Sequence, residues 1–352
     1  MKLRLKNTPE QVELIKAMGS RDTAVAREAT EAFAAFLGPV VNKVLMQAGT
    51  ASAVYTDLPF DEDDSPSIPL DLFAGEGEGY VTTWSQTVAG GLPTSTVEGF
   101  SEMKVSTYRL DSAVSFLKRY ARRGRLDVVS KAVERMSNEV LVKQERNAWA
   151  VVLKALANSG NVIEKAGGTD STFQLSMLNA LVTRVKRINT SYAGGSTTDA
   201  YGLTDLFVSP EVKEDIRAFA YQPMGISATT DLPANVREGI YNSAGTQEIY
   251  GITIHELIEL GEGQKYQTLF SDFYSGGTWD STTDELIVGL DLTKDAFVRP
   301  VARQAESGGV FSALPDDQFV ARSEKIGFYG FLEEGRVCID SRAIAGLTVS
   351  NA

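Results

Sequence analysis

Apolar side chains recur at every third or fourth position in the first fifty residues, which is the spacing of helices with one buried face. Pro9 begins the first predicted helix, Ile15 and Met18 lie on its apolar face, and Gly19 ends it. A second helix is predicted from about residues 21–37, where a Gly-Pro pair interrupts it before "VVNKVLMQAG" resumes it. We expect this amphipathic helix to lie across the surface of a neighbouring molecule.

The longest helical pattern runs from Asp127 to about Ala157 and contains no Gly or Pro. At a rise of ~1.5 Å per residue, a helix of this length spans about 45 Å. A further helix is predicted over residues 172–188. The apolar stripe of the long helix consists of Val129, Val133, Met136, Val140 and Leu141.

The pattern becomes shorter and more alternating after residue 190. "DLFVSP" predicts a buried strand ended by proline, "EVKEDIRAFA" a short helix, and "IYGITIHELIEL" one or two strands. The last 70 residues alternate apolar and polar positions, which predicts successive strands and hairpins. Helices followed by strands in this order indicate an α+β fold.

A strand-rich segment between the helical regions has charge of one sign only. "YVTTWSQTV" and "EMKVSTYRL" flank the turn region "AGGLPTSTVEGFS", a pattern that predicts a long β-hairpin. Residues 44–103 contain ten Asp or Glu and no Lys or Arg. Because a two-stranded hairpin is marginally stable alone, we expect this arm to lie on a basic partner.

The segment "KRYARRGR", residues 118–125, is the candidate partner of the acidic arm. We interpret it as a patch that contacts another subunit, and a contact with nucleic acid remains the alternative. The expected contact residues are Asp61, Glu62, Asp63, Asp64, Glu76, Glu78, Trp84 and Glu98 on the arm, and Lys118, Arg119, Arg122, Arg123 and Arg125 in the basic segment.

Composition narrows the class of protein further. The formal net charge of −12 argues against nucleic-acid binding by the chain as a whole, since phosphate contacts need clustered Lys and Arg. No apolar run approaches the ~18 residues of a membrane span, so no membrane partner is expected. The single cysteine, Cys338, excludes an intramolecular disulfide and favours a reducing compartment.

The only histidine lies in "HELIE", residues 255–259, which differs by one residue from the zinc motif H-E-x-x-H. A zinc-binding helix needs two histidines one turn apart, whereas Ile252, Ile254 and Ile258 alternate as they do in a strand. We therefore expect a strand that packs through these three isoleucines. His255 is then expected to face the other way, toward a neighbouring molecule.

Other motifs give no support for catalysis. "GEGEG" at residues 75–79 resembles a phosphate-binding loop, but its glutamates would repel a phosphate. "DEDDS" at residues 61–65 lacks the spacing of an EF-hand, which leaves open a weak cation site. Cys338 lies in an alternating segment and is expected to pack. We expect this protein to have no enzymatic activity and no cofactor. The enzymatic alternative is a metal hydrolase that uses His255 and Glu256.

In this order, the parts resemble the major capsid proteins of tailed bacteriophages of the Hong Kong 97 type. "GYVTTWSQTVAGGLPTSTVEGFSEMKVSTYRLDSAVSF" is similar to that family's extended loop, and "LDVVSKAVERMSNEVLVKQERNAWAVVLKAL" stands in the place of its spine helix. "TDLFVSPEVKEDIRAF" and "EIYGITIHEL" are similar to elements of its axial domain. The ending "QFVARSEKIGFYGFLEEGRVCIDSRAIAGLTV" is similar to its closing peripheral-domain strands.

The resemblance implies a shell-forming subunit. It would form hexamers and pentamers that tile an icosahedral virion capsid, assembled in the host cytoplasm, around double-stranded DNA whose sequence it does not read. Portal, scaffolding or cement proteins are implied as further partners, and an encapsulin-type compartment of the same fold is the alternative. The implied parts are an N-terminal arm (1–56), an extended loop (57–108), a peripheral domain with the spine helix (109–190), an axial domain (191–284) and peripheral-domain strands (285–352).

The chain departs from the family's pattern in two places. Some members crosslink a loop lysine to another subunit, but no lysine lies between Ser85 and Gly99, and Lys104 lies at the base of the arm. We therefore expect no covalent crosslink. About 50 residues precede the arm, whereas some members begin with a longer scaffolding domain, so we expect scaffolding to be separate or absent.

Overall fold

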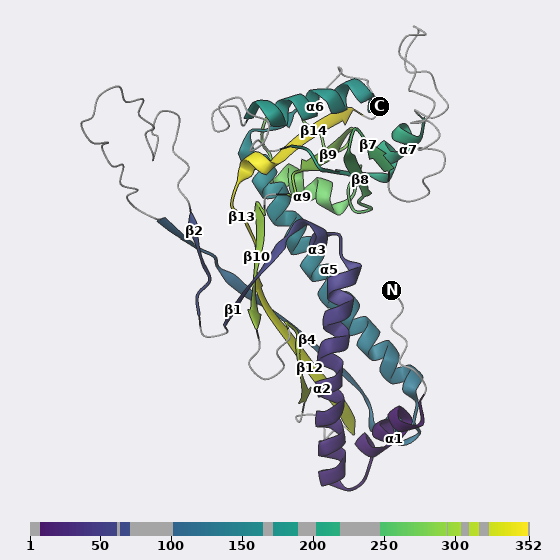
Figure 1. Ribbon diagram of the computed structural model, residues 1–352. Coiled ribbons are helices and arrows are strands. Elements are labelled where there is room, and N and C mark those ends of the chain that lie inside the picture. The colour runs from purple at the N-terminus through teal and green to yellow at the C-terminus, as the bar shows by residue number, and fades with distance from the viewer. Residues whose placement is uncertain are drawn as a thin grey trace, which may run out of the picture.

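The computed structural model describes residues 8–61, 64–70, 101–164, 172–188, 202–218, 247–293, 295–303, 310–316 and 324–350. Over these residues the molecule is elongated: a long helix joins two β-sheets, and a two-stranded ribbon projects from one side (Figure 1). The expected α+β class is confirmed. Among the described helices, none is both long enough and apolar enough to cross a membrane.

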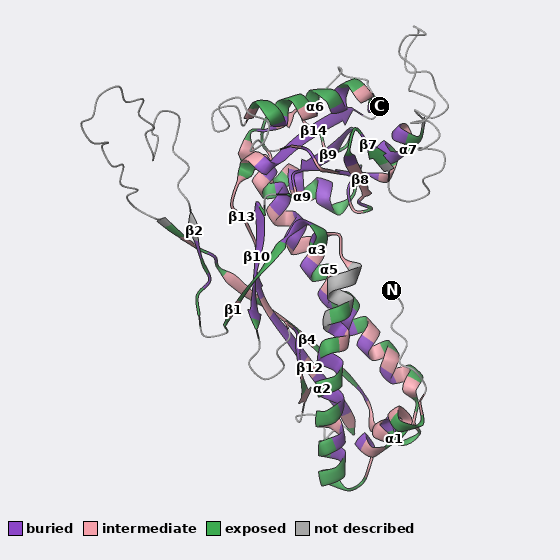
Figure 2. Ribbon diagram, in the orientation of Figure 1, coloured by how far each residue is buried: buried purple, intermediate pink, exposed green. Residues whose placement is uncertain are grey.

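Helix α5 (Leu126–Ser159) confirms the long helix predicted from the sequence. Gly160 follows it with φ 66°, the left-handed conformation that commonly ends helices. The first half of α5 buries Val129 and Val133 against the first sheet, and the second half buries Leu153 and Leu156 against the second (Figure 2). One helix therefore contributes to both hydrophobic cores.

The N-terminal segment forms α1 (Pro9–Met18) and α2 (Thr23–Ala48). The predicted interruption at the Gly-Pro pair is wrong, because α2 continues through Pro39. A proline inside a helix costs about 3 kcal/mol. Burial of apolar residues on both sides of it, including Leu37 and Val41, offsets that cost.

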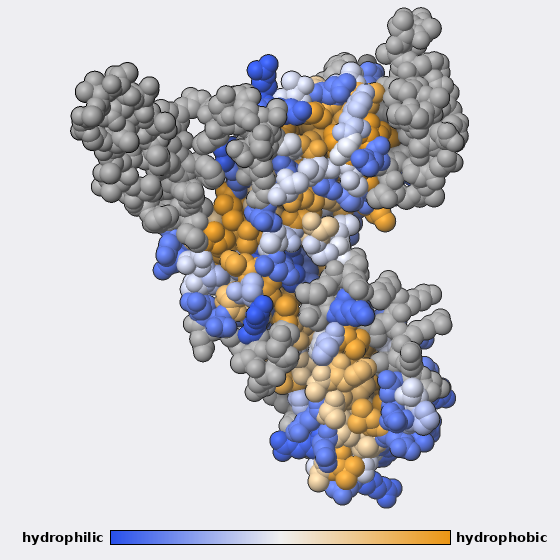
Figure 3. Space-filling view, in the orientation of Figure 1, coloured by the Kyte–Doolittle hydropathy of each residue, from blue (hydrophilic) through white to orange (hydrophobic). Residues whose placement is uncertain are grey.

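Helix α2 packs on its own chain rather than on a neighbour. The ring of Phe33 lies 5.2 Å from the ring of Phe328 in the first sheet, so the apolar face predicted to meet another molecule is covered within the subunit. The outer face of α2 keeps Val25 and Phe36 exposed, and Figure 3 shows apolar surface over this helix. A short helix, α3 (Ala51–Val54), follows.

The first sheet is built around one long strand, β12. Strand β4 pairs with β12 along its whole length on one side, and β10 and β11 pair with it on the other. Strand β1 runs parallel to β10 at the edge, and the short helix α4 (Lys118–Arg122) follows β4. The strands are β1 (Thr56–Asp61), β4 (Thr107–Leu117), β10 (Phe297–Arg303), β11 (Ser312–Asp316), β12 (Lys325–Gly335) and β13 (Val337–Cys338).

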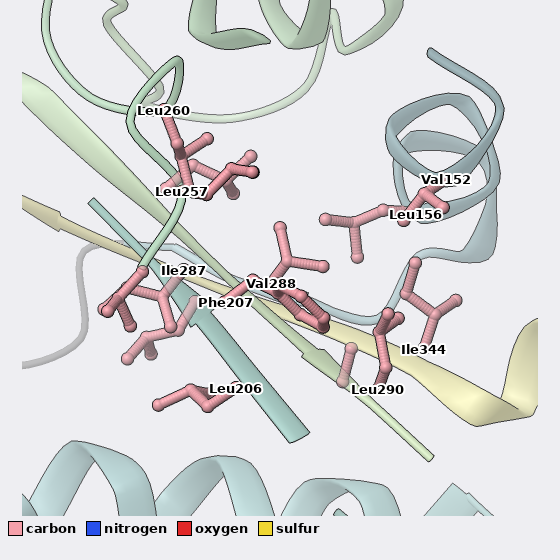
Figure 4. Close-up of a cluster of buried hydrophobic side chains, with 14 of the residues drawn as sticks. Val152, Leu156, Leu206, Phe207, Leu257, Leu260, Ile287, Val288, Leu290 and Ile344 are labelled. Atoms are coloured by element: carbon pink, nitrogen blue, oxygen red, sulfur yellow. The ribbon is translucent and has the colours of Figure 1, made fainter. Parts of the chain in front are cut away.

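The second sheet has the strand order β5-β14-β9-β6-β8-β7. Helix α6 covers one face, and α5 and α9 cover the other (Figures 1 and 4). The strands are β5 (Val162–Ile163), β6 (Asp205–Val208), β7 (Gln247–Ile249), β8 (Ile252–Glu256), β9 (Asp284–Leu290) and β14 (Ile344–Ser350). The helices are α6 (Leu175–Ile188), α7 (Pro210–Ala218) and α9 (Lys265–Phe273), and the 3-10 turn η2 (Ser341–Ala343) precedes β14.

The C-terminal segment contributes strands to both sheets. Strands β10, β11, β12 and β13 belong to the first sheet, whereas β9 and β14 pair with each other in the second. Every residue of both strands is buried. A strand that is buried on both faces is predicted to lie in the centre of a sheet. The burial pattern does not indicate which of the two sheets the strand belongs to.

The projecting ribbon consists of β2 (Ser67–Leu70) and β3 (Ser101–Lys104), which pair in antiparallel fashion. The predicted strand 102–110 is thus divided between β3 and β4. The predicted strand "YVTTWSQTV" and the glycine-rich "GEGEG" lie outside the described residues. The ribbon leaves the body beside β1 (Figure 1).

Candidate assembly surfaces

The base of the ribbon carries the acidic side of the expected contact between subunits. Asp61 and Asp64 are exposed and line a hollow of about 390 Å³ between β1 and β2, together with Arg303. The other predicted arm residues, Glu62, Asp63, Glu76, Glu78, Trp84 and Glu98, lie outside the described residues. In the part of the chain that the structure describes, Asp61 and Asp64 are therefore the predicted acidic contact residues at the base of the ribbon.

The basic side of the expected contact is formed by α4 and the turn after it. The structure brings together all five predicted residues: Lys118, Arg119, Arg122, Arg123 and Arg125. The Arg122 side chain donates from Nε to the carbonyl oxygen of Gly19, 2.9 Å away, and so ties α4 to the end of α1. Lys118 and Arg123 form no ion pair with a described residue, so these two are available to an external anion.

A hollow of about 440 Å³ lies beside this basic surface. Its floor contains the buried side chains of Met18, Ala26 and Ile326, and Lys118 and Asp316 line it as well. An apolar floor next to positive charge suits a segment that combines apolar and acidic side chains. Residues 44–103 have that composition.

Strand β4 separates the two charged surfaces within one subunit. Its first residue, Thr107, follows the ribbon, and its last, Leu117, precedes the basic helix α4 (Figure 1). Eleven extended residues span about 36 Å at ~3.3 Å per residue. Ion pairs need contact within about 4 Å. Asp61 and Asp64 at the base of the ribbon therefore cannot form ion pairs with the basic residues of α4 in the same chain.

A buried ionic cluster, the Glu334 cluster, lies where the arm, β10, β12 and α5 meet. The Glu334 carboxylate accepts from Arg299 Nε at 2.7 Å, Gln144 Nε2 at 3.0 Å and Tyr108 Oη at 2.7 Å. Arg336 approaches the same carboxylate at 3.2 Å. Burial would raise the pKa of Glu334, but Arg299 and Arg336 outweigh it and hold the pKa below its usual value.

The Glu334 cluster links the base of the arm to the long helix. Arg299 also pairs with Asp57 of β1 at 3.3 Å, and Gln144 comes from α5. Burial and the nearby carboxylate raise the pKa of Tyr108 to about 12, so its hydroxyl remains a donor. This cluster was not predicted from the sequence, although Glu334 is in phase with the buried Phe328 and Leu332 on an alternating strand.

The charged side chains of the "HELIE" segment have partners within the chain. His255 Nε2 lies 2.7 Å from the Asp205 carboxylate, and its ring stacks on Phe207 with centroids 4.9 Å apart. Glu256 pairs with Lys213 at 2.7 Å, and Glu259 approaches Arg146 of α5 at 3.5 Å. Within the described residues, no group of three or more His, Cys, Asp or Glu could hold a metal ion.

One expectation about this strand is corrected by the structure. Ile252 and Ile254 are buried as predicted, but β8 ends at Glu256 and Ile258 is 74% exposed in the loop beyond it. His255, expected to face a neighbouring molecule, is partnered by Asp205 of its own chain.

Cys338 in β13 packs, as expected, against the second core. Burial raises the pKa of the Cys338 thiol to about 12, so at neutral pH it stays protonated. A protonated thiol is a poor nucleophile, and this side chain therefore offers no basis for covalent catalysis.

Comparison with known proteins finds likeness in structure only. No protein-family model matches the chain, and no curated protein sequence matches it. A chain from a structure of Microbacterium phage Oxtober96 aligns with a TM-score of 0.53 at 14% identity, covering 86% of this chain and 90% of that one. The Cyanophage Pam1 capsid asymmetric unit gives 0.52 at 11% identity, covering 85% and 89%.

A third structure agrees with these two. The acidic stable capsid of Helicobacter pylori bacteriophage KHP30 aligns with a TM-score of 0.50 at 8% identity, covering 86% of this chain and 91% of that one. The chain therefore has the fold of phage capsid proteins over most of its length. Its elongated arrangement of ribbon, long helix and two sheets agrees with the resemblance to Hong Kong 97 type capsid proteins.

Proposed function

We propose that this chain is a major capsid protein whose copies assemble as hexamers and pentamers into an icosahedral shell around double-stranded DNA. The observation that carries the proposal is the separation of the acidic residues that follow β1 from the basic helix α4 that follows β4, in a chain with a phage capsid fold. Surfaces that are complementary but cannot meet within one subunit favour head-to-tail contacts, which close into rings. The shell would assemble in the host cytoplasm and become part of the virion.

The two charged surfaces would bring neighbouring subunits into register. Lys118 and Arg123 of one subunit would face Asp61, Asp64 and the acidic residues beyond them on the next. Such complementarity speeds association and selects orientation more than it adds affinity. Salt at about 1 M reduces the screening length to ~3 Å, so closure should slow as salt rises.

Electron microscopy of the purified, overexpressed protein tests the proposal as a whole. We expect closed shells or partial shells built from rings. A protein that remains monomeric at every salt and protein concentration would contradict the proposal. Shells that hold a protein cargo and no nuclease-protected DNA would indicate an encapsulin-type compartment instead.

The electrostatic contact is tested by Lys118→Glu combined with Arg123→Glu. These residues are preferable to Arg122, whose side chain holds Gly19 within the subunit. Reversing both charges places like charges across the proposed interface, so shell closure at low salt should fall about ten-fold or more. Light scattering measures the rate, and electron microscopy measures the yield.

A matched control carries the same charge reversals elsewhere. Arg217→Glu with Lys265→Glu changes two exposed cations on α7 and α9, far along the chain from α4. This control should assemble at the normal rate. Equal loss in both variants would mean that net charge, rather than the contact at α4, controls closure.

A further inference from the structure

Helix α2 has a second apolar face, on the side that does not pack against the first sheet. This face, the α2 stripe, consists of the exposed residues Val25, Ala32, Ala35, Phe36 and Pro39. Each member is three, four or seven positions from another, which places them along one side of the helix. Figure 2 shows exposed residues along α2, and Figure 3 shows apolar surface over it. Single exposed apolar side chains are normal, but a continuous stripe of them indicates a contact surface.

The α2 stripe is separate from the surfaces of α2 that already have a role. At 3.6 residues per turn, Pro39 lies about 160° around the helix from the buried Leu37. The hollow beside the basic surface is lined by Ala26 and Thr30, which project from another side of α2. Neither the core of the subunit nor the charged contact proposed above therefore covers the stripe.

One charge of each sign lies near each end of the α2 stripe. Glu28 and Lys43 are exposed, and neither forms an ion pair with a described residue, whereas Arg27 pairs with Glu31. Fifteen positions separate Glu28 from Lys43, which is about 22 Å along a helix, so they cannot pair within one copy. Both lie more than one turn from the ends of α2, where the helix dipole no longer accounts for a charge.

The positions of these two charges match when the helix is paired with itself in reverse. The midpoint between Glu28 and Lys43 lies between Ala35 and Phe36. If a second α2 lies antiparallel across a twofold axis at this midpoint, Glu28 of each copy faces Lys43 of the other. A parallel pair would place Glu28 beside Glu28 and Lys43 beside Lys43, so the charges favour the antiparallel arrangement.

The apolar members of the stripe fit the same arrangement. Ala32 and Pro39 lie at equal distances from the midpoint, so each would face the other across the axis. The large ring of Phe36 would face the small side chain of Ala35, and alternation of large and small side chains allows close packing. Helices packed through small residues approach to about 8 Å between axes.

We propose that the α2 stripe pairs in antiparallel fashion with the α2 stripe of a second copy of this chain, across a twofold axis between Ala35 and Phe36. This contact differs from the charged head-to-tail contact, because both copies use the same surface. Head-to-tail contacts close one ring, and the α2 contact would join one ring to the next. Only this place in a shell rests on the proposed function, since pairing of two free subunits does not require it.

The size of the contact sets how strongly free subunits should pair. One pair of helices buries less than the roughly 1,200 Å² of a stable complex, so we expect a weak dimer of the free subunit. Rings that present several copies of α2 would pair more strongly, because each contact after the first forms within one assembly.

Disulfide crosslinking tests the geometry of the pair. The variants are made in the Lys118→Glu and Arg123→Glu background, so that the charged contact does not bring subunits together. Copies of Ala35→Cys would lie beside the axis, within the ~7 Å between Cα atoms that a disulfide needs. Copies of Ala24→Cys, an exposed position on the same helix, would lie about 34 Å apart. Under mild oxidation, Ala35→Cys should give at least about ten-fold more crosslinked dimer on a non-reducing gel.

A charge exchange tests the same pair without a crosslink. Sedimentation equilibrium in the same background should show dimer affinity at least about ten-fold lower for Glu28→Lys, because Lys43 of the other copy then faces a like charge. Glu28→Lys combined with Lys43→Glu should restore the wild-type affinity. Glu139→Lys, which changes an exposed glutamate of α5, is the matched control and should leave the affinity unchanged. Circular dichroism confirms that each variant is folded.

Each remaining outcome decides the matter. Equal crosslinking through Ala35→Cys and Ala24→Cys, or no rescue by the charge exchange, overturns the antiparallel pair. Subunits that do not associate at any concentration also overturn it, since another protein or the chain itself then covers the stripe. A specific Ala35→Cys crosslink in a protein that never forms shells supports the α2 pair and contradicts only the proposed function. Normal shells from Glu28→Lys with no crosslink contradict only the α2 pair.

Discussion

Glu334 lies in the fold where four separate segments meet. Its carboxylate is fully buried and takes hydrogen bonds or ion pairs from β4, α5, β10 and Arg336, the residue before β13. Arg336 is buried too, and its Nη1 atom has no partner among the described residues. A buried carboxylate between two guanidinium groups is specific in geometry, since moving Arg299 or Arg336 away from it would leave a charge without this partner.

Replacing Glu334 with Gln should destabilise the unassembled subunit strongly. The change leaves Arg299 and Arg336 buried without their shared anion, a situation that typically costs 3–5 kcal/mol, so we expect a loss of about 4 kcal/mol. Urea denaturation followed by fluorescence measures it. Glu333→Gln is the control, because Glu333 is only half-buried and accepts one hydroxyl hydrogen bond from Thr107. A loss in the control as large as in Glu334→Gln would contradict the assigned role.

The wild type and the Glu334→Gln variant should differ in how their stability changes at acidic pH. Because the pKa of Glu334 is lowered in the folded state, its contribution to stability is present above the unfolded pKa of about 4.3. That contribution is lost as pH falls through the folded value. The wild type should therefore lose stability more steeply than Glu334→Gln below about pH 4.3, and parallel curves would argue against this titration.

Helix α2 shows how packing overrides a local signal. A Gly-Pro pair ordinarily ends a helix, and the sequence pattern alone favours a break there. In the fold, the same helix passes over β11 and β12 and buries Phe33, Leu37 and Val41. The contacts that keep it straight come from residues nearly 300 positions later, which no local pattern contains.

Phe33→Ala and Phe36→Ala test which face of α2 packs within the subunit. Phe33 is 3% exposed and contacts Phe328, whereas Phe36, three residues later, is 42% exposed. Truncating the buried ring should cost about 3–5 kcal/mol, and truncating the exposed one less than about 1 kcal/mol. Thermal denaturation of the unassembled subunits compares them. Equal losses would mean that the outer face of α2 is also buried in the free subunit.

Local patterns predicted the elements better than their partners. Helix α5 lies within one or two residues of its predicted limits, because a 3.6-residue period and a following glycine are sequence-local signals. Strands β9 and β14 were predicted as strands, but their pairing with each other was not, since pairing depends on distant segments. The basic residues of α4 were found by charge alone, whereas Glu334 required knowing that Arg299 and Arg336 would meet it.

The whole molecule is elongated, with complementary charges at separated points, and this shape suits a ring-forming subunit. Each copy presents its acidic ribbon base on one side and its basic α4 surface at the far end of β4. In a head-to-tail arrangement every subunit uses both surfaces, so none remains unmatched once the ring closes.

Charge exchange within one chain gives the sharpest test of this arrangement. Asp61→Lys with Asp64→Lys should impair closure alone, as should Lys118→Glu with Arg123→Glu, because each leaves like charges facing each other. A chain carrying all four changes restores opposite charges at every contact and keeps the original net charge. It should therefore close shells at a rate near that of the wild type, and more slowly in high salt. If the fourfold variant assembles no better than either double variant, these two surfaces do not meet in the shell.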